Sequence, residues 1–224
     1  AAPHAVHMSP LQILRALDDA IMPVRCVFCG TRTHDGEGFI CAECLEDLPW
    51  NEASPARSDS VFERVIVPLA YEFPIDAAVK AFKFRRKLHY GPAFAQLLCG
   101  VSNELPDDVD AVLPVPLHWR RKWWRGFNQA LEIAKPLAKQ LDLPVIDIAR
   151  RHRATPPQSG LSAKQRATNL RGAFRVQSTD TYEHVLIIDD VITTGTTITQ
   201  LGQALRRGGV TRISAFALAR SGER

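Results

Sequence analysis

The sequence has 224 residues, of which 46% are hydrophobic, and its formal net charge is +4 at pH 7. This length suits one α/β domain with a small appendage. No apolar run is long enough to span a membrane, so we expect no membrane insertion. The N-terminus has no secretory pattern, and we expect a cytoplasmic protein.

Composition divides the chain into four expected segments. Residues 1–7 resemble a tag, and residues 8–50 combine a helix with a cysteine-rich module. Residues 51–60 are polar and contain Pro55, which predicts a linker. Residues 61–224 form the expected main domain.

Positive charge is concentrated in the middle of the chain. Between Lys80 and Arg153 there are fourteen Lys and Arg residues and seven Asp and Glu residues. This surplus fits an anionic partner, and it also fits an ordinary solvated basic face. Trp119, Trp123 and Trp124 lie among basic residues, which is typical of surfaces that stack the bases of single-stranded DNA. The alternative is that these tryptophans belong partly to the core.

Four cysteines form two Cys-x-x-Cys pairs, Cys26 with Cys29 and Cys41 with Cys44. Each pair can make a tight turn that offers two thiolates to one tetrahedral ion, so the spacing predicts a Zn²⁺ site. Gly30 fits the turn after the first pair. Four thiolates complete the coordination shell, which indicates a structural ion. Two disulfides or free thiols are the alternatives.

Strand-like and helix-like patterns alternate along the rest of the chain. We expect helices at 10–22, 74–87, 91–101, 126–141, 163–170 and 198–205, and strands at 61–73, 109–116, 144–148, 185–188 and 211–218. Pro68 indicates that the first strand is broken or lies at an edge. The alternation predicts a parallel sheet with helices on both faces and a ligand site at the carboxyl ends of its strands.

The most informative stretch is Val185–Thr197, VLIIDDVITTGTT. Its apolar start predicts a buried strand, and Asp189 and Asp190 follow where that strand is expected to end. A threonine-rich loop then leads into a helix, for which Thr193 or Thr194 is the expected N-cap. The start of a helix suits a phosphate, and the acids beside it suit hydroxyls or a metal ion. Together they describe a site for ribose 5-phosphate. The alternative is a capped helix with solvent-facing acids.

This stretch resembles the signature of type I phosphoribosyltransferases, in which an acidic pair precedes a threonine-glycine loop. The resemblance implies that Asp189 and Asp190 act in catalysis and hold the ribose hydroxyls of phosphoribosyl pyrophosphate (PRPP), which binds with Mg²⁺. The implied 5-phosphate site consists of Thr193, Thr194, Gly195, Thr196 and Thr197. The implied pyrophosphate site consists of Val115, Pro116, Arg120, Arg121 and Arg125.

Further motifs indicate a narrower family. They are Pro114–Pro116, Arg125–Ala130, Thr155–Gln158, Gly160–Leu161, Arg166, Asn169–Phe174 and Asp189–Thr197. With the cysteine module they resemble the ComF family over about Cys26–Arg220. The resemblance implies a type I phosphoribosyltransferase-like domain behind a zinc-ribbon-like module. It also implies a bacterial cytoplasmic protein tied to natural competence, the uptake of DNA, or to gluconate or DNA utilisation.

Three functions fit these observations. The first is an enzyme that transfers the phosphoribosyl group of Mg²⁺–PRPP to a nitrogen nucleophile and releases pyrophosphate. The second is a non-catalytic protein that senses PRPP or a nucleotide and binds single-stranded DNA beside a competence ATPase. The third is a base-salvage phosphoribosyltransferase. We expect a PRPP-binding protein of DNA uptake, and no segment of the sequence describes a pocket for an acceptor base.

Overall fold

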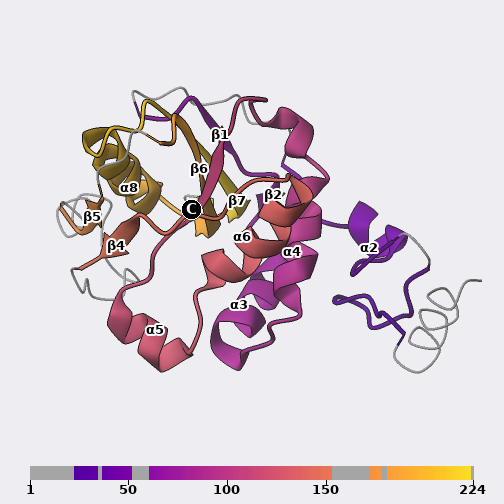
Figure 1. Ribbon diagram of the computed structural model, residues 1–224. Helices are drawn as coiled ribbons and strands as arrows, with labels where there is room; N and C mark the ends of the chain where they lie inside the picture. The colour runs from indigo at the N-terminus through magenta and orange to yellow at the C-terminus, as the bar shows by residue number, and fades with distance from the viewer. Residues whose placement is uncertain (1–22, 35–36, 52–60, 153–171, 178–180, 223–224) are drawn as a thin grey trace, which may run out of the picture. The chain divides into compact units, whose positions relative to one another are not determined.

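The computed structural model describes residues 23–34, 37–51, 61–152, 172–177 and 181–222. The chain divides into two compact units, residues 1–47 and residues 48–224, which are described separately (Figure 1). The expected helices at 10–22 and 163–170 lie outside the described residues, as does the expected linker except for Asn51. Among the helices of the described ranges, none has both the length and the apolar sequence that a membrane crossing requires.

The N-terminal unit is built around its cysteines. Cys26 and Cys41 are buried together with Ile40, which is 1% exposed. The N–H of Gly30 donates to the Cys26 carbonyl at 2.9 Å, and Gly30 has a φ of +77°, so glycine closes the turn after the first cysteine pair. A short helix, α2 (Ala42–Glu46), starts directly after Cys41.

The larger unit contains a parallel sheet with strand order β1-β7-β6-β3, and β2 also pairs with β7. The strands are β1 (Arg64–Ile66), β2 (Leu69–Ala70), β3 (Ala111–Pro114), β6 (His184–Ile192) and β7 (Arg212–Arg220). Every pair among them is parallel. β6 and β7 lie in the middle of the sheet and are mostly apolar, because both of their faces are covered. The predicted parallel sheet is therefore confirmed.

Helices cover both faces of this sheet (Figure 1). They include α3 (Ile75–Arg85), α4 (Tyr90–Cys99), α6 (Gln129–Gln140) and α8 (Thr196–Arg207). α4 packs against α3 and α6, while α8 shares a core with Val185, Ile187 and other alternate residues of the strands. A Cβ atom at Gly91 would lie 3.1 Å from the Glu132 carbonyl oxygen, so glycine permits the close approach of α4 and α6.

The strand that carries the acidic pair is longer than predicted. β6 runs to Ile192, because Asp189, Val191 and Ile192 are still paired with β7. The two carboxylates therefore lie within the last part of the strand and not beyond its end. The predicted break at Pro68 is confirmed, since this residue separates β1 from β2.

Three other local predictions were wrong. The expected strand at 144–148 makes only an isolated bridge from Val145 to Val112. The nearby strands are β4 (Ala149–Arg151) and β5 (Phe174–Val176), which form a separate antiparallel pair. The stretch between the expected strand at 109–116 and the expected helix at 126–141, where no helix was expected, contains α5 (Trp119–Arg125), since Arg and Lys are good helix formers. The N-cap of α8 is Gly195, with no side-chain cap, and not Thr193 or Thr194.

Candidate functional site

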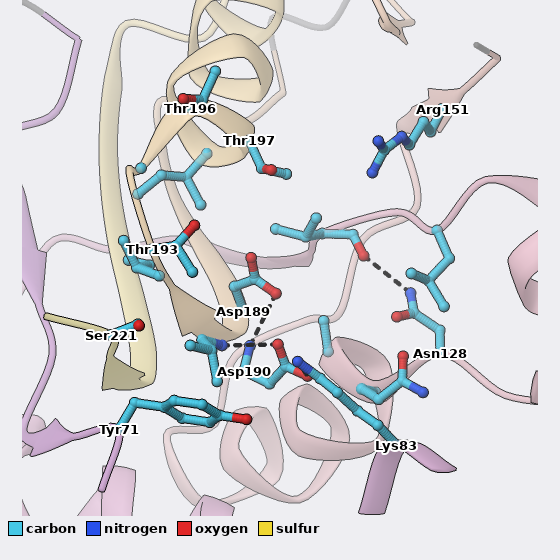
Figure 2. Close-up of a pocket in the computed structure, with 18 of the residues that line it drawn as sticks. Tyr71, Lys83, Asn128, Arg151, Asp189, Asp190, Thr193, Thr196, Thr197 and Ser221 are labelled. Carbon is cyan, nitrogen blue, oxygen red and sulfur yellow. Dashed lines mark hydrogen bonds and ion pairs between the residues drawn. The ribbon is translucent and has the colours of Figure 1, made fainter. Parts of the chain in front are cut away.

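A cleft of about 290 Å³ opens in the larger unit, where β3, β6 and β7 end (Figure 2). Its lining comes from several separate segments of the chain. The lining residues are Tyr71, Lys83, Val115, Leu117, Arg125, Asn128, Gln129, Ala130, Arg151, Asp189, Asp190, Val191, Ile192, Thr193, Gly195, Thr196, Thr197, Ile198 and Ser221. The site thus lies at the carboxyl ends of the parallel strands, as the alternating pattern predicts.

The acidic pair lies inside this cleft. Asp189 is partly exposed, whereas Asp190 is 6% exposed. The N–H of Asp190 donates to Asp189 Oδ1 at 2.9 Å, and the N–H of Val191 donates to Asp190 Oδ1 at 2.7 Å. Desolvation, followed by the negative charge of Asp190, raises the pKa of Asp189 to about 7. Asp189 therefore gives up its proton less readily than an exposed aspartate.

A lysine on α3, a helix far away in the sequence, forms an ion pair with the second acid. Lys83 extends from α3, and its Nζ lies 2.8 Å from Asp190 Oδ2. The two side chains are only 20% and 9% exposed, so solvent screens this ion pair less than a surface pair. Figure 2 shows the Lys83 chain reaching toward Asp190 across the cleft. Asp190 is thus held at both of its oxygens.

The threonine-rich loop lies beside the acids, at the start of α8. Thr193, Gly195, Thr196 and Thr197 line the cleft, whereas Thr194 is not among the lining residues. Gly195 has a φ of +74°, a conformation that favours glycine, and the Thr194 and Thr196 hydroxyls are 2.8 Å apart. The first N–H groups of a helix have no acceptor within it. Together with the helix dipole they form a suitable place for an anion.

The residues expected to bind pyrophosphate are not all at the cleft. Val115 and Arg125 line it, whereas Pro116 does not. Arg120 and Arg121 lie on α5, and their side chains are outside the described part of the structure. The backbone around β3 and Arg125 thus brings two of the five predicted residues into the cleft.

Two amide side chains at the start of α6 contribute polar groups to the same wall. Asn128 Nδ2 donates to the Val115 carbonyl at 3.1 Å, and Arg125 donates to Gln129 Oε1 at 3.0 Å. These bonds fix which way each amide points. Within the described ranges, the buried atoms Asn128 Oδ1 and Gln129 Nε2 then have no hydrogen-bond partner. Such buried unpaired groups are rare, and both belong to residues that line the cleft.

The sequence did not assign a role to several residues that line the cleft. They are Tyr71, Lys83, Asn128, Gln129, Arg151 and Ser221. Asn128 and Gln129 belong to one of the motifs that resemble the ComF family, which is the signal that could have found them. Lys83 was one of several basic residues in an expected helix, and no local pattern separates it from its neighbours.

The four cysteines of the N-terminal unit form one cluster. The sulfur atoms of Cys26, Cys29, Cys41 and Cys44 all lie within 4.8 Å of one another, and none of the four is in a disulfide bond. Hydrogen bonds from Thr31 lower the pKa of Cys29 to about 6. Burial, followed by the neighbouring thiols, raises the pKa of Cys44. This donor set is compatible with a zinc module, and the structure does not support the disulfide alternative.

Aromatic side chains are exposed on α5 and at the end of α3. Trp119, Trp123 and Trp124 are 63%, 85% and 65% exposed, so they are not core residues. Phe84 of α3 is 60% exposed, and the Arg125 guanidinium lies 5.3 Å from the centre of its ring. We call these four aromatic residues the aromatic surface. It combines stacking groups with neighbouring positive charge.

Known proteins resemble this chain in sequence. Residues 128–224 match the family model of the phosphoribosyl transferase domain. Competence protein F of Haemophilus influenzae is 29% identical, over 88% of this chain and 97% of that protein. DNA utilization protein YhgH of Shigella flexneri is 31% identical, over 88% of this chain and 84% of that protein. The solved orotate phosphoribosyltransferase from Aeropyrum pernix is 24% identical, with a TM-score of 0.40, over 62% of this chain and 66% of that one.

Proposed function

The chain belongs to the ComF family, and we propose that it is a PRPP-binding, phosphoribosyltransferase-like protein that acts in DNA uptake or DNA utilisation. The phosphoribosyl transferase match supports the ligand, and the names of the relatives support the process. We also propose a cytoplasmic location, because four clustered cysteines that form no disulfide suit a reducing compartment.

The observation that carries this proposal is the combination of groups in one cleft. An acidic pair, the start of a 12-residue helix and the side chain of Arg125 all line it. In our proposal, the 5-phosphate binds at Thr193–Thr197, and Asp189 and Asp190 accept hydrogen bonds from the ribose hydroxyls. The pyrophosphate extends toward Val115, Pro116, Arg120, Arg121 and Arg125. Arginine suits such a polyanion because its guanidinium can donate two parallel hydrogen bonds.

The proposed reaction is a substitution at C1 of the ribose. The bond from C1 to the pyrophosphate oxygen breaks, pyrophosphate leaves with the electron pair, and a nitrogen nucleophile bonds to C1 and releases its proton to water. Positive charge develops on the sugar, and Asp189 and Asp190 stabilise it by their charge and by orienting the ribose. When bound, Mg²⁺ neutralises phosphate charge. Asp189 and Asp190 would hold this ion, since their carboxylate oxygens fit its preference for oxygen ligands.

We further propose that Cys26, Cys29, Cys41 and Cys44 hold one structural Zn²⁺ ion. Their sulfur atoms are close enough to share one ion. Four thiolates leave no open position for a substrate, so the ion has no catalytic role. Metal binding stabilises the small N-terminal unit, whose described residues, 23–34 and 37–47, bury few apolar side chains.

The aromatic surface supports a second activity, the binding of single-stranded DNA. Trp123 is 85% exposed on a helix that also carries Arg and Lys residues. Exposed aromatic rings stack with bases of any sequence, and basic groups neutralise the phosphates. This activity is compatible with PRPP binding, since the aromatic surface includes none of the residues that line the cleft. A competence ATPase remains the expected protein partner.

Substitution of the acidic pair tests the proposed site. We expect the double variant Asp189→Asn, Asp190→Asn to lose PRPP binding in calorimetric titration while it stays folded. Asp107→Asn is the control, because this exposed aspartate precedes β3 at the end of the strand away from the cleft. A double variant that binds PRPP with the affinity of the unsubstituted protein would show that the acids do not hold the ribose.

A further inference from the structure

The ion pair that Lys83 forms differs from the ion pair of Lys80 on the same helix. Lys80, three residues earlier on α3, is 59% exposed and pairs with Asp76 one turn away. Lys83 instead points into the cleft, is 20% exposed and pairs with Asp190 of β6. The Lys80 pair is a surface pair of the kind that contributes little, whereas the Lys83 pair joins two elements at the candidate site.

The core holds Lys83 in this position. The neighbouring residue Phe82 is fully buried, and the centre of its ring lies 5.5 Å from the ring centres of both Phe94 and Phe127. α3 therefore cannot rotate without disrupting aromatic packing. The Lys83 side chain leaves this packed helix, and its ammonium group lies at Asp190 in the cleft.

The candidate ligand, PRPP, brings further negative charge to a cleft that already holds two carboxylates. PRPP carries phosphate charges at both ends of its ribose, and the acidic pair adds negative charge beside it. Like charges this close oppose binding, most strongly where water is excluded. A cation within the cleft reduces this repulsion. Lys83 is such a cation, and Asp190 is its partner at 2.8 Å.

We propose that Lys83 is a ligand-positioning residue that acts through Asp190. Its ammonium group, 2.8 Å from Asp190 Oδ2, holds the carboxylate in the orientation that accepts ribose hydroxyls. It also offsets the charge of the acidic pair, so that a phosphoribosyl polyanion can enter the cleft. This inference rests on the proposed function, and it assigns to α3 a role in ligand binding that residues 128–224 alone cannot supply.

A purely structural role makes a different prediction. If Lys83 only joins α3 to β6, its loss lowers the stability of the fold, and the surviving folded protein binds its ligand normally. A positioning role predicts the opposite result: loss of Lys83 changes the affinity for the ligand much more than the stability of the fold. Restoring the positive charge with arginine then restores most of the binding, because Arg can still pair with Asp190.

The test compares Lys83→Met, Lys83→Arg and Lys80→Met in the full chain. Calorimetric titration with Mg²⁺–PRPP and with ribose 5-phosphate measures affinity, and the thermal midpoint checks folding. We expect Lys83→Met to weaken PRPP binding by about ten- to a hundredfold, the range for loss of a charged hydrogen bond. We expect Lys83→Arg to recover most of this loss and Lys80→Met to match the unsubstituted protein.

The outcomes distinguish failure of the proposed role of Lys83 from failure of the proposed function. If the unsubstituted protein binds PRPP and folded Lys83→Met binds it equally well, the role of Lys83 is overturned and the proposed function stands. If Lys80→Met weakens binding as much as Lys83→Met, the effect is a general one of positive charge, and the specific role is again overturned. If the unsubstituted protein binds neither ligand, the proposed function fails and the role of Lys83 fails with it.

Discussion

The side-chain amide of Asn128 donates a hydrogen bond to the Val115 carbonyl at 3.1 Å and thereby joins the end of β3 to the start of α6. The bond orients the amide, so that Asn128 Oδ1 is the atom left for other partners. The neighbouring Gln129 is oriented in the same way by Arg125. One buried acceptor and one buried donor, unpaired within the described residues, are thus fixed at the wall of the cleft.

A first prediction concerns Gln129, which is 3% exposed. Gln129→Leu removes a buried donor that has no partner in the described part of the chain, and it also removes the acceptor of the Arg125 hydrogen bond, so we expect the free energy of unfolding to fall by about 1 kcal/mol. We expect PRPP affinity to fall about tenfold, because the ligand loses a hydrogen-bond donor. Gln140→Leu, at the other end of α6, is the control and should leave affinity unchanged. Equal affinity in Gln129→Leu and the unsubstituted protein would contradict the assignment.

A second prediction concerns pH. The folded-state pKa of Asp189 is raised to about 7, whereas an ordinary aspartate has a pKa of about 3.9. Between these values the unfolded chain releases this proton more readily than the folded chain, so Asp189 lowers stability as pH rises from about 4 to about 7. Asp189→Asn lacks this effect.

Thermal unfolding of the unsubstituted protein and of Asp189→Asn, from pH 4 to pH 8, measures this effect of Asp189 on stability. We expect the midpoint of Asp189→Asn to exceed that of the unsubstituted protein at pH 8, by about 2–4 °C for each kcal/mol that the buried charge costs, and the difference to shrink toward pH 4. A difference that is the same at every pH would show that the carboxylate does not titrate in this range. The measurement is made without PRPP, because the ligand has its own titrating groups.

A third prediction concerns the cysteine cluster. We expect metal analysis to find about one Zn²⁺ per chain, as four cysteine ligands require. Cys44→Ser should lose the metal, and Cys99→Ser should keep it, because Cys99 lies on α4 in the other unit. Removal of zinc with a strong chelator should make the N-terminal unit sensitive to protease first. An unchanged protease pattern after verified loss of metal would exclude a structural role.

A fourth prediction concerns the aromatic surface. The double variant Trp123→Ala, Trp124→Ala should bind single-stranded DNA at least about tenfold more weakly, because each stacked base contributes about 1–3 kcal/mol. Phe73→Ala is the control. Phe73 is 82% exposed and precedes α3, about 16 Å along the helix from Phe84. The salt dependence of binding should stay the same in the double variant, since its basic groups are intact. If the double variant and Phe73→Ala bind DNA with equal affinity, the aromatic surface is not the binding site.

Local chemistry explains what the sequence could predict. Asp189, Asp190 and the threonine loop are contiguous, and the apolar run before them identifies a central strand. The cysteine pairs are equally local. Their spacing predicts one cluster, and the structure brings all four sulfur atoms together. In each case the informative residues are neighbours in the chain, so no knowledge of the tertiary fold is needed.

Tertiary contacts explain what the sequence could not predict. β6 extends to Ile192 because β7 continues beside it, and no local signal marks that pairing. β4 and β5 are three residues each and are formed by pairing with one another. Lys83 is one of several basic residues near the end of α3, and only the packing of that helix directs it to Asp190. The missed site residues thus come from segments that the fold brings together.

The most direct test of the central claim is a calorimetric titration of the zinc-loaded full chain with PRPP and Mg²⁺, followed by a measurement of pyrophosphate release. The account predicts saturable binding at about one PRPP per chain, as one cleft requires. Release that is stimulated by single-stranded DNA or by a free base would identify the acceptor class. Binding without release would indicate a PRPP-dependent binding protein. The absence of any PRPP binding by folded, zinc-loaded protein would contradict the account.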